Sequence, residues 1–237
     1  MPGSPPHRLP RGRHALAREE VQRIQRTRLC GAMAEVMAEK GYVSTSVADV
    51  LQRASVSRQS FYELFESKLD CFMAAFACAG EILLGRLNEH IAEHAAEPPD
   101  GASPGAAGGA AGGPGPDERL RLCELAIRAY LRALADELPY ARLFLVEVYA
   151  AGPEAIRDRG RLQETISDAL ADLTGGGDET ARFACRMIVA ATSAMVTPPV
   201  AENDRDALLA LGEPLIAHIR VLWNAGIIGT VPAPAAT

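Results

Sequence analysis

The sequence predicts an all-α protein in which a three-helix N-terminal domain precedes a larger helical body. Ala, Leu, Arg and Glu dominate the 237 residues, and aromatic residues make up only 5%, a composition that favours helices. Apolar residues recur at helical spacing in one segment after another. Gly and Pro stand mainly between these segments, where helices end and begin. A chain of this length can bury a substantial core.

The stretch from Thr45 to Lys68, TSVADVLQRASVSRQSFYELFESK, predicts two short helices joined by a tight turn. Ser46 is a favourable N-cap, and Asp49 three residues later completes a capping-box pattern. The turn falls at Ser55-Val56-Ser57, and Ser57 is placed to cap the second helix.

The second helix, residues 58–64, is expected to bury Phe61 and to expose a polar face. A short helix that presents Arg, Gln, Ser and Tyr, braced at a steep angle by its partner, fits the major groove of DNA. There such side chains bond base edges and phosphates. The exposed residues are Arg58, Gln59, Ser60, Tyr62 and Glu63. Lys68 follows at the start of the next helix, where its charge adds to the free N–H groups and can clamp a phosphate.

With Gly41-Tyr42 before it and LDCF after it, this stretch resembles the helix-turn-helix of the TetR family of one-component transcriptional regulators. The resemblance implies a homodimer on a double-stranded inverted-repeat operator, repressing until a small-molecule effector releases it. It also implies that Arg58 and Gln59 read bases. By the same resemblance, the phosphate contacts come from Ser46, Ser60, Tyr62 and Lys68, with Ser57 beside them at the start of the helix.

Three positions depart from the usual pattern of the family. Ala48 stands where an arginine is frequent, Leu64 replaces a frequent histidine, and Ser55 replaces a frequent turn glycine. These departures keep open an alternative, a helical ligand-binding or scaffolding protein whose helix-turn-helix does not bind DNA. An enzyme is a weaker alternative, because the sequence has no H-E-x-x-H, P-loop or G-x-G-x-x-G motif, and we expect no catalytic residue.

Charge is unevenly distributed along the chain. Residues 1–68 carry 11 Lys and Arg against 7 Asp and Glu, a net +4, whereas the remainder carries 13 against 23, a net −10. A basic N-terminal part on an acidic body suits one face that meets a polyanion.

Five scattered cysteines without a C-x-x-C pair are typical of small buried hydrophobes in a reducing cytoplasm, with a redox switch as the alternative. No apolar run is expected to span a membrane. His90 and His94 have a spacing that can bind a metal, but no third ligand stands nearby, so we expect neither a metal nor a cofactor.

The predicted domains are a flexible basic arm (1–17), a helix-turn-helix domain (18–66), a ligand-binding and dimerisation body (67–228) and a disordered tail (229–237). The arm either gains order in the minor groove or remains a solvated tail. Residues 97–116 hold 7 Gly, 5 Pro and 5 Ala and predict a flexible loop inside the body. The predicted helices cover residues 18–40, 47–54, 58–64, 68–95, 118–137, 139–152, 153–174, 178–197 and 204–225, the last kinked at Pro214.

Two functional surfaces of the body can be proposed from residue type. An apolar effector pocket with a few polar groups is expected, although aromatic and Met residues at helical spacing are more often plain core. Its candidate residues are Tyr130, Phe144, Glu147, Phe183 and Met187. The segment 178–197 is apolar almost all round and must be buried on every side, either centrally in one chain or, as the resemblance implies, in a dimer interface. The candidate interface residues are Met187, Ala191, Leu208, Leu215, Ile219 and Leu222.

Overall fold

The computed structural model describes residues 18–95 and 114–229, without the side chains of residues 94 and 95. The predicted arm, nearly all of the predicted 97–116 loop, the His94 side chain and the tail from residue 230 lie outside the described residues. Within them the chain is helical and contains no strand, as the sequence predicted. The helices are α1 (Arg18–Ser44), α2 (Val47–Ala54), α3 (Arg58–Leu64), α4 (Lys68–Ala95), α5 (Pro116–Asp136), α6 (Leu138–Arg142), the π-helical η1 (Leu143–Glu147), α7 (Val148–Ala151), α8 (Pro153–Thr174), α9 (Glu179–Glu202), α10 (Arg205–Ala210) and α11 (Gly212–Asn224).

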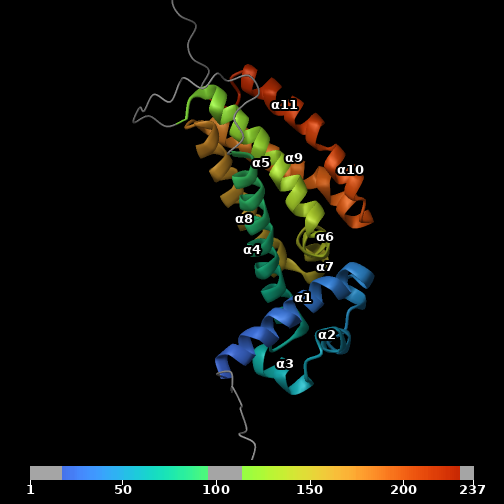
Figure 1. Ribbon diagram of the computed structural model, residues 1–237. Coiled ribbons are helices and arrows are strands. Elements are labelled where there is room, and N and C mark those ends of the chain that lie inside the picture. Colours follow the sequence, from blue (N-terminus) through green and yellow to red (C-terminus); the bar gives the residue numbers. More distant parts are fainter. Residues whose placement is uncertain (1–17, 96–113, 230–237) are drawn as a thin grey trace, which may run out of the picture.

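The molecule has two parts that share one core. Figure 1 shows α1, α2 and α3 packed together at one end, while α4 to α11 form an elongated body. Leu29 and Phe61 of the small part and Leu134 and Val196 of the body belong to the same buried apolar cluster. A second cluster, around Trp223, lies between α5, α8, α9 and α11. Because α4 begins beside α1–α3 and runs along the body, it joins the two parts directly.

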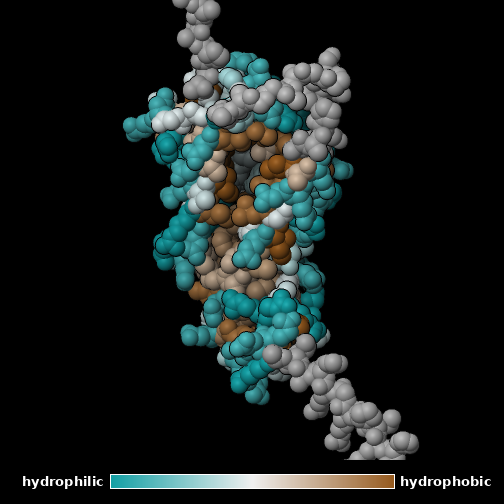
Figure 2. All heavy atoms as spheres, turned by 60° about the vertical axis from the view of Figure 1, so that its left-hand side comes forward, coloured by the Kyte–Doolittle hydropathy of each residue, from teal (hydrophilic) through white to brown (hydrophobic). Residues whose placement is uncertain are grey.

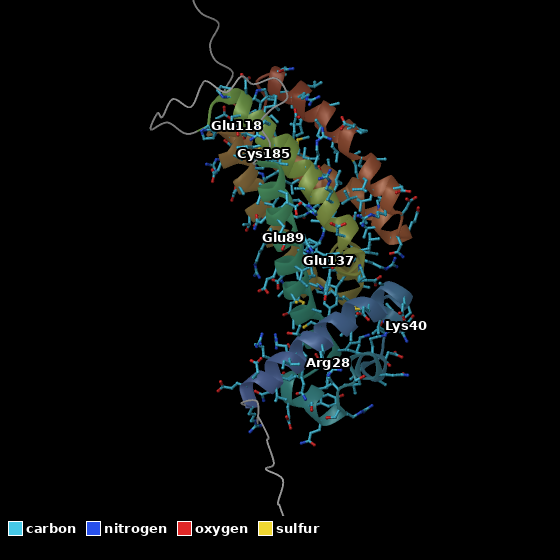
Figure 3. The ribbon with its side chains drawn as sticks, viewed as in Figure 1. Arg28, Lys40, Glu89, Glu118, Glu137 and Cys185 are labelled. Carbon is cyan, nitrogen blue, oxygen red and sulfur yellow. The ribbon has the colours of Figure 1, made fainter. Side chains whose placement is uncertain are left out.

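An ion-pair bridge on the surface joins α4 to the end of α5. Arg86 of α4 lies 3.0 Å from Glu89 on its own helix and 2.9 Å from Glu137, which follows α5. Figure 3 labels both carboxylates, which lie close together between these helices. Nearby, His90 Nε2 lies 3.0 Å from Asp136 Oδ2, so this histidine also faces α5.

The first helix breaks at Gly41, where the sequence predicted its end. Gly41 has φ 75° and ψ 165°, a left-handed φ that glycine adopts without a Cβ penalty. One further helical turn follows the break and ends at Ser44. The break therefore redirects the chain toward α2 beside the body.

The helix predicted from Pro139 to Gly152 is continuous but not regular. Its middle turn, η1, is π-helical, and Leu143, Phe144, Leu145 and Glu147 are all buried there. A π turn inserts one extra residue, a feature frequent at functional sites. The wide turn brings the Glu147 carboxylate to the junction with α1.

Four expectations for the termini of the helices need correction. α9 passes through Pro198 and Pro199 and ends only at Asn203, which caps it with φ 54°. The last predicted helix breaks at Leu211, so that Pro214 lies in the first turn of α11, where its missing N–H costs no bond. α5 starts at Pro116, two residues before the predicted start at residue 118, after an N-cap at Gly115. The chain after Gly226 is packed rather than loose, because Ile228 is buried in the Trp223 cluster.

One helix has the length of a membrane span, which does not conflict with the expectation that no segment crosses a membrane. By length and composition, α9 is the one helix among residues 18–95 and 114–229 that could cross a membrane, with a mean hydropathy of 1.3. One such helix is a weak indication, because core helices of soluble proteins pass the same test.

Candidate nucleic-acid interface and effector cavity

The start of α2 is fixed by the capping box that the sequence predicted. Ser46 Oγ accepts a bond from Asp49 N at 3.2 Å, and Asp49 Oδ2 accepts one from Ser46 N at 2.8 Å. Lys40, labelled near the end of α1 in Figure 3, places its Nζ 2.7 Å from Asp49 Oδ1. The bonds from Lys40 and then from Ser46 hold the pKa of the Asp49 carboxyl well below its usual range. The carboxylate therefore stays charged at the N-terminus of α2.

The turn between α2 and α3 is tight and carries strain. Ser55 adopts a left-handed conformation, with φ 54° and ψ 46°. Ser57 then caps α3 by accepting a bond from Ser60 N at 3.0 Å. A residue with a Cβ pays roughly 1–2 kcal/mol for the left-handed conformation at Ser55.

The recognition helix α3 is anchored on one face and open on the other. Phe61 and Phe65 are buried, with ring centroids 5.5 Å apart. Arg58, Gln59 and Tyr62 are exposed, and 54% of Tyr62 is accessible. Gln59 Nε2 donates to Glu63 Oε1 at 3.0 Å, whereas Arg58 has no hydrogen bond or ion pair with any described residue. Of the two side chains predicted to read bases, Arg58 is thus free, whereas Gln59 is held by Glu63 on the same helix.

The three serines of the predicted site have structural partners. Ser46 and Ser57 are N-caps, and both are exposed. Ser60 is half-buried, and its Oγ lies 2.9 Å from Ser57 Oγ and accepts a bond from Gln25 Nε2 at 3.4 Å. Ser46 and Ser57 thus fix the starts of α2 and α3, and Ser60 joins α3 to Gln25 of α1.

Lys68 is bound inside the protein rather than held out toward a phosphate. Its Nζ donates to the carbonyls of Tyr42 at 2.9 Å and Thr45 at 3.0 Å, and lies 4.1 Å from the centroid of the Tyr42 ring. These carbonyls stand at the C-terminal end of α1, where a positive charge is favourable. In the structure Lys68 therefore fastens the end of α1 to the start of α4, and its contact with a phosphate stays a prediction.

A second bond joins the same residue, Tyr42, to the body. Tyr42 N donates to Glu147 Oε2 at 2.7 Å, and Arg142 Nε lies 3.2 Å from Glu147 Oε1. Arg142 also donates to the carbonyl of Ala201 near the end of α9. A Cβ on Gly41 would lie 3.4 Å from Glu147 Oε2, so the glycine also lets the backbone approach the carboxylate. We call these contacts the junction: Tyr42, Glu147, Arg142 and Lys68.

The body holds a cavity of about 190 Å³ between α4, α5, η1, α8 and α9. Figure 2 shows a hollow surrounded by hydrophobic residues on the body. Apolar walls come from all five elements, and the polar side chains are few. The residues that line the cavity include Leu83, Leu87, Tyr130, Phe144, Leu145, Gln163, Leu170, Thr192 and Ser193. An enclosed apolar space with a few polar groups is typical of a small-molecule site.

Only part of the predicted pocket lines this cavity. Tyr130 and Phe144 do, but Glu147 belongs to the junction. Phe183 and Met187 are 55% and 58% exposed, on a different face of α9 from the residues that line the cavity. These three placements are corrected, because residue type alone did not say which face of a helix turns inward.

The predicted dimer interface is also only partly at the surface. Met187 and Ala191 are exposed on α9, and Leu215 and Leu222 are half-buried. Leu208 and Ile219 are buried inside their own chain, so they are corrected to core residues. The exposed apolar face of α9 instead contains Phe183, Met187, Ala191 and Met195, and a groove between α9 and α11 adjoins it at Met195.

The helix-turn-helix geometry agrees with a known family. Residues 31–75 match the family model described as bacterial regulatory proteins, tetR family. These residues carry the helix-turn-helix of the TetR family, as the sequence indicated. No curated protein matches the chain in sequence. The family consists of regulators of transcription, and α1–α3 form its DNA-binding domain.

Solved structures share the fold along most of the chain. The fatty acid degradation regulator FadR from Bacillus halodurans superposes with a TM-score of 0.61 at 18% identity, over 82% of this chain and 94% of that chain. FadR from Bacillus subtilis, in complex with stearoyl-CoA, gives 0.60 at 18% identity, over 81% and 96%. A transcriptional regulator from Rhodococcus sp. RHA1 gives 0.57 at 22% identity, over 87% and 99%. These TM-scores show a common fold that includes the body of the chain.

Proposed function

We propose that this protein is a homodimeric repressor of the cytoplasm that binds an inverted-repeat operator and is released by a small-molecule effector. The observation that carries the proposal is α3, whose Arg58, Gln59 and Tyr62 are exposed while Phe61 holds the helix on the core. Arg prefers guanine O6 and N7, and Gln prefers adenine N6 and N7. A helix so equipped can read a half-site in the major groove.

Dimerisation is supported by the apolar face of α9. Phe183, Met187 and Met195 are 55%, 58% and 43% exposed in the single chain. Several large apolar side chains exposed on one helix mark a site of association. Pairing two copies through this face would bury it, and would present two recognition helices to one duplex.

Release by an effector is supported by the position of η1, which lines the cavity and also contacts the end of α1. Phe144 and Leu145 line the cavity, and Glu147 of the same turn bonds Tyr42 N at the end of α1. A ligand that repacks η1 therefore acts on the element that holds the DNA-binding domain. The solved FadR from Bacillus subtilis carries stearoyl-CoA, which supports a small-molecule site in this fold.

A mobility-shift titration on the DNA upstream of the protein's own gene tests the proposal. We expect binding that weakens steeply with salt, because phosphate contacts release counterions. Arg58→Ala should relax the sequence preference, losing roughly 1–3 kcal/mol of discrimination at one base pair. Arg161→Ala, at an exposed arginine of α8 paired with Asp158, is the matched control and should bind like wild type.

The alternatives predict a different result. A scaffolding or ligand-binding protein with an inactive helix-turn-helix would show no salt-dependent retention of any duplex, and Arg58→Ala would change nothing. If the upstream region is not bound, sequencing the genomic fragments retained by the purified protein decides whether another operator exists.

A further inference from the structure

Arg159 of α8 is a buried cation without an acidic partner. Only 9% of it is exposed, and no carboxylate of the described residues lies within ion-pair distance. Its Nη2 donates to Ser193 Oγ at 2.6 Å, and its Nη1 makes a long contact of 3.5 Å with Gln163 Oε1. The buried Nε has no hydrogen-bond partner among the described residues.

Arg142, a half-buried arginine at the junction, shows what is missing. Arg142 faces the Glu147 carboxylate at 3.2 Å and also donates to a carbonyl. Arg159 has instead a hydroxyl, an amide and the Tyr149 ring, whose centroid lies 5.2 Å from Cζ. Burying a charge is costly unless a counter-charge compensates for it. An unpaired buried guanidinium therefore calls for an anion from outside the chain.

The unpaired cation lies directly behind two polar residues of the cavity wall. Gln163 and Ser193, which contact Arg159, both line the cavity. Tyr130 lines it too, and burial raises the pKa of its hydroxyl to about 12, so it remains a neutral donor. From Gln163 the wall continues along α8 to Leu170, about 10 Å farther on at 1.5 Å per residue. The space thus has a polar end and an apolar remainder.

We infer that the effector is an apolar carboxylic acid whose carboxylate pairs with Arg159 while its hydrocarbon part fills the cavity. The free Nε and the weakly held Nη1 supply the donors, and the long Gln163 contact is the one that gives way. The hydrocarbon part lies against Leu83, Leu87 and Leu170. This inference rests on the proposed function, because it names the chemical class of the effector of that same site.

Calorimetric titration of the full chain with octanoate and with octan-1-ol tests the inference. The two probes share a hydrocarbon tail and differ in charge. We expect octanoate to bind about 10- to 100-fold more tightly than octanol, the range for a hydrogen bond to a charged group. Across hexanoate, octanoate and decanoate, affinity should rise about fourfold per methylene until the cavity is full. Octanoyl-CoA, which lacks the free carboxylate, should bind no more tightly than octanol.

Substitution of Arg159 locates the charge that makes this distinction. Arg159→Met keeps an unbranched side chain, removes the charge, and should make octanoate no better than octanol while octanol binds as before. Arg159→Lys should keep part of the preference. Arg161→Met is the matched control two residues away on the exposed side of α8, where Arg161 is 74% exposed and paired with Asp158, and it should bind both probes like wild type.

Several results would overturn the inference. Equal binding of acid and alcohol by the wild-type protein, tighter binding of octanoyl-CoA, or no binding of any of the acids would each do so. An unchanged preference in Arg159→Met would do so as well, and if that variant fails to fold, the wild-type comparison and Arg159→Lys decide. DNA retention by the ligand-free protein is measured in parallel. A chain that binds DNA but ignores the acids fails only this inference, whereas one that binds acids but no DNA fails the proposed function.

Discussion

Lys68 shows how a residue in a favourable position can serve a different role. By residue type and by its place at a helix N-terminus it fits a phosphate clamp. In the structure two of its three ammonium hydrogens are directed to the Tyr42 and Thr45 carbonyls. The carbonyls at the end of α1 have no partner within the helix, so they bind the same ammonium group that could contact a phosphate.

Lys68→Met distinguishes the two roles. We expect a loss of roughly 1.5–3 kcal/mol in the free energy of unfolding, because the Tyr42 and Thr45 carbonyls lose their hydrogen bonds from a charged donor. Urea unfolding followed by circular dichroism measures it. Lys40→Met is the control, since its surface pair with Asp49 should be worth about 1 kcal/mol or less. Unchanged stability together with uniformly weaker DNA binding would restore the phosphate role.

Ser55 occupies a position that favours glycine. With φ 54° and ψ 46° it lies in the left-handed region, where its Cβ makes the conformation unfavourable. Ser55→Gly should therefore raise the free energy of unfolding by roughly 0.5–1 kcal/mol, after the entropy that glycine loses on folding. Ser57→Gly, two residues on, should lower it by a few tenths, because Ser57 has a negative φ and gives α3 its cap. The same sign in both variants would mean that the turn is not strained.

At the scale of elements, local signals predicted the fold best. Ser46 with Asp49, and Ser57, gave the starts of α2 and α3 because an N-cap acts within one turn. The end of α9 predicted from Pro198 and Pro199 was wrong, because a helix packed in the body tolerates a missing N–H that an isolated helix would not. No local pattern in the sequence predicted the π turn of η1. Its Glu147 bonds Tyr42, a residue far away in the sequence.

The same limit applied to the candidate sites. The pattern of apolar residues identified α9 as a helix apolar all round, but it did not say which of its faces meets the cavity. Phe183 and Met187 thus belong to the outer surface and Thr192 to the cavity. Arg159 escaped notice because Arg157 and Arg161 flank it, and sequence gives no sign that only the middle one is buried.

The outer face of α9 makes a prediction about assembly. Met187→Lys should convert the dimer to a monomer, because it places a charge in the centre of an apolar interface. The monomer should fold normally, since Met187 is 58% exposed in the single chain. Sedimentation velocity measures the assembly, and Ile156→Lys on exposed α8 is the matched control. A wild-type monomer, or a dimer that persists in Met187→Lys, would place the interface elsewhere.

For the whole molecule, the junction and the cavity form one continuous path. Tyr42 N donates to Glu147 of η1, and the Tyr42 carbonyl accepts a bond from Lys68 of α4, so η1 and α4 both hold the end of α1. Phe144 of η1 stacks on Phe76 of α4, with ring centroids 4.8 Å apart. A change in the packing of the cavity wall therefore reaches the DNA-binding domain through two bonded elements rather than one.

Two such domains, held by one dimer, require a fixed spacing on DNA. Half-sites read by paired recognition helices lie roughly 34–36 Å apart or a multiple of that distance. Inserting about five base pairs between the half-sites turns one of them to the opposite side of the duplex. We expect affinity to fall by about 100-fold or more, the loss of bivalent binding, in a mobility-shift titration on the operator found by sequencing.

The same loss should follow from Met187→Lys on the unmodified operator, because a monomer also engages one half-site. Since both changes remove the same bivalency, their effects should not add: Met187→Lys should bind the spaced operator no more weakly than wild type does. A base change inside one half-site should instead weaken every combination that uses it. If the spacing and Met187→Lys effects multiplied, the dimer would contribute to DNA affinity by some route other than joining two recognition helices.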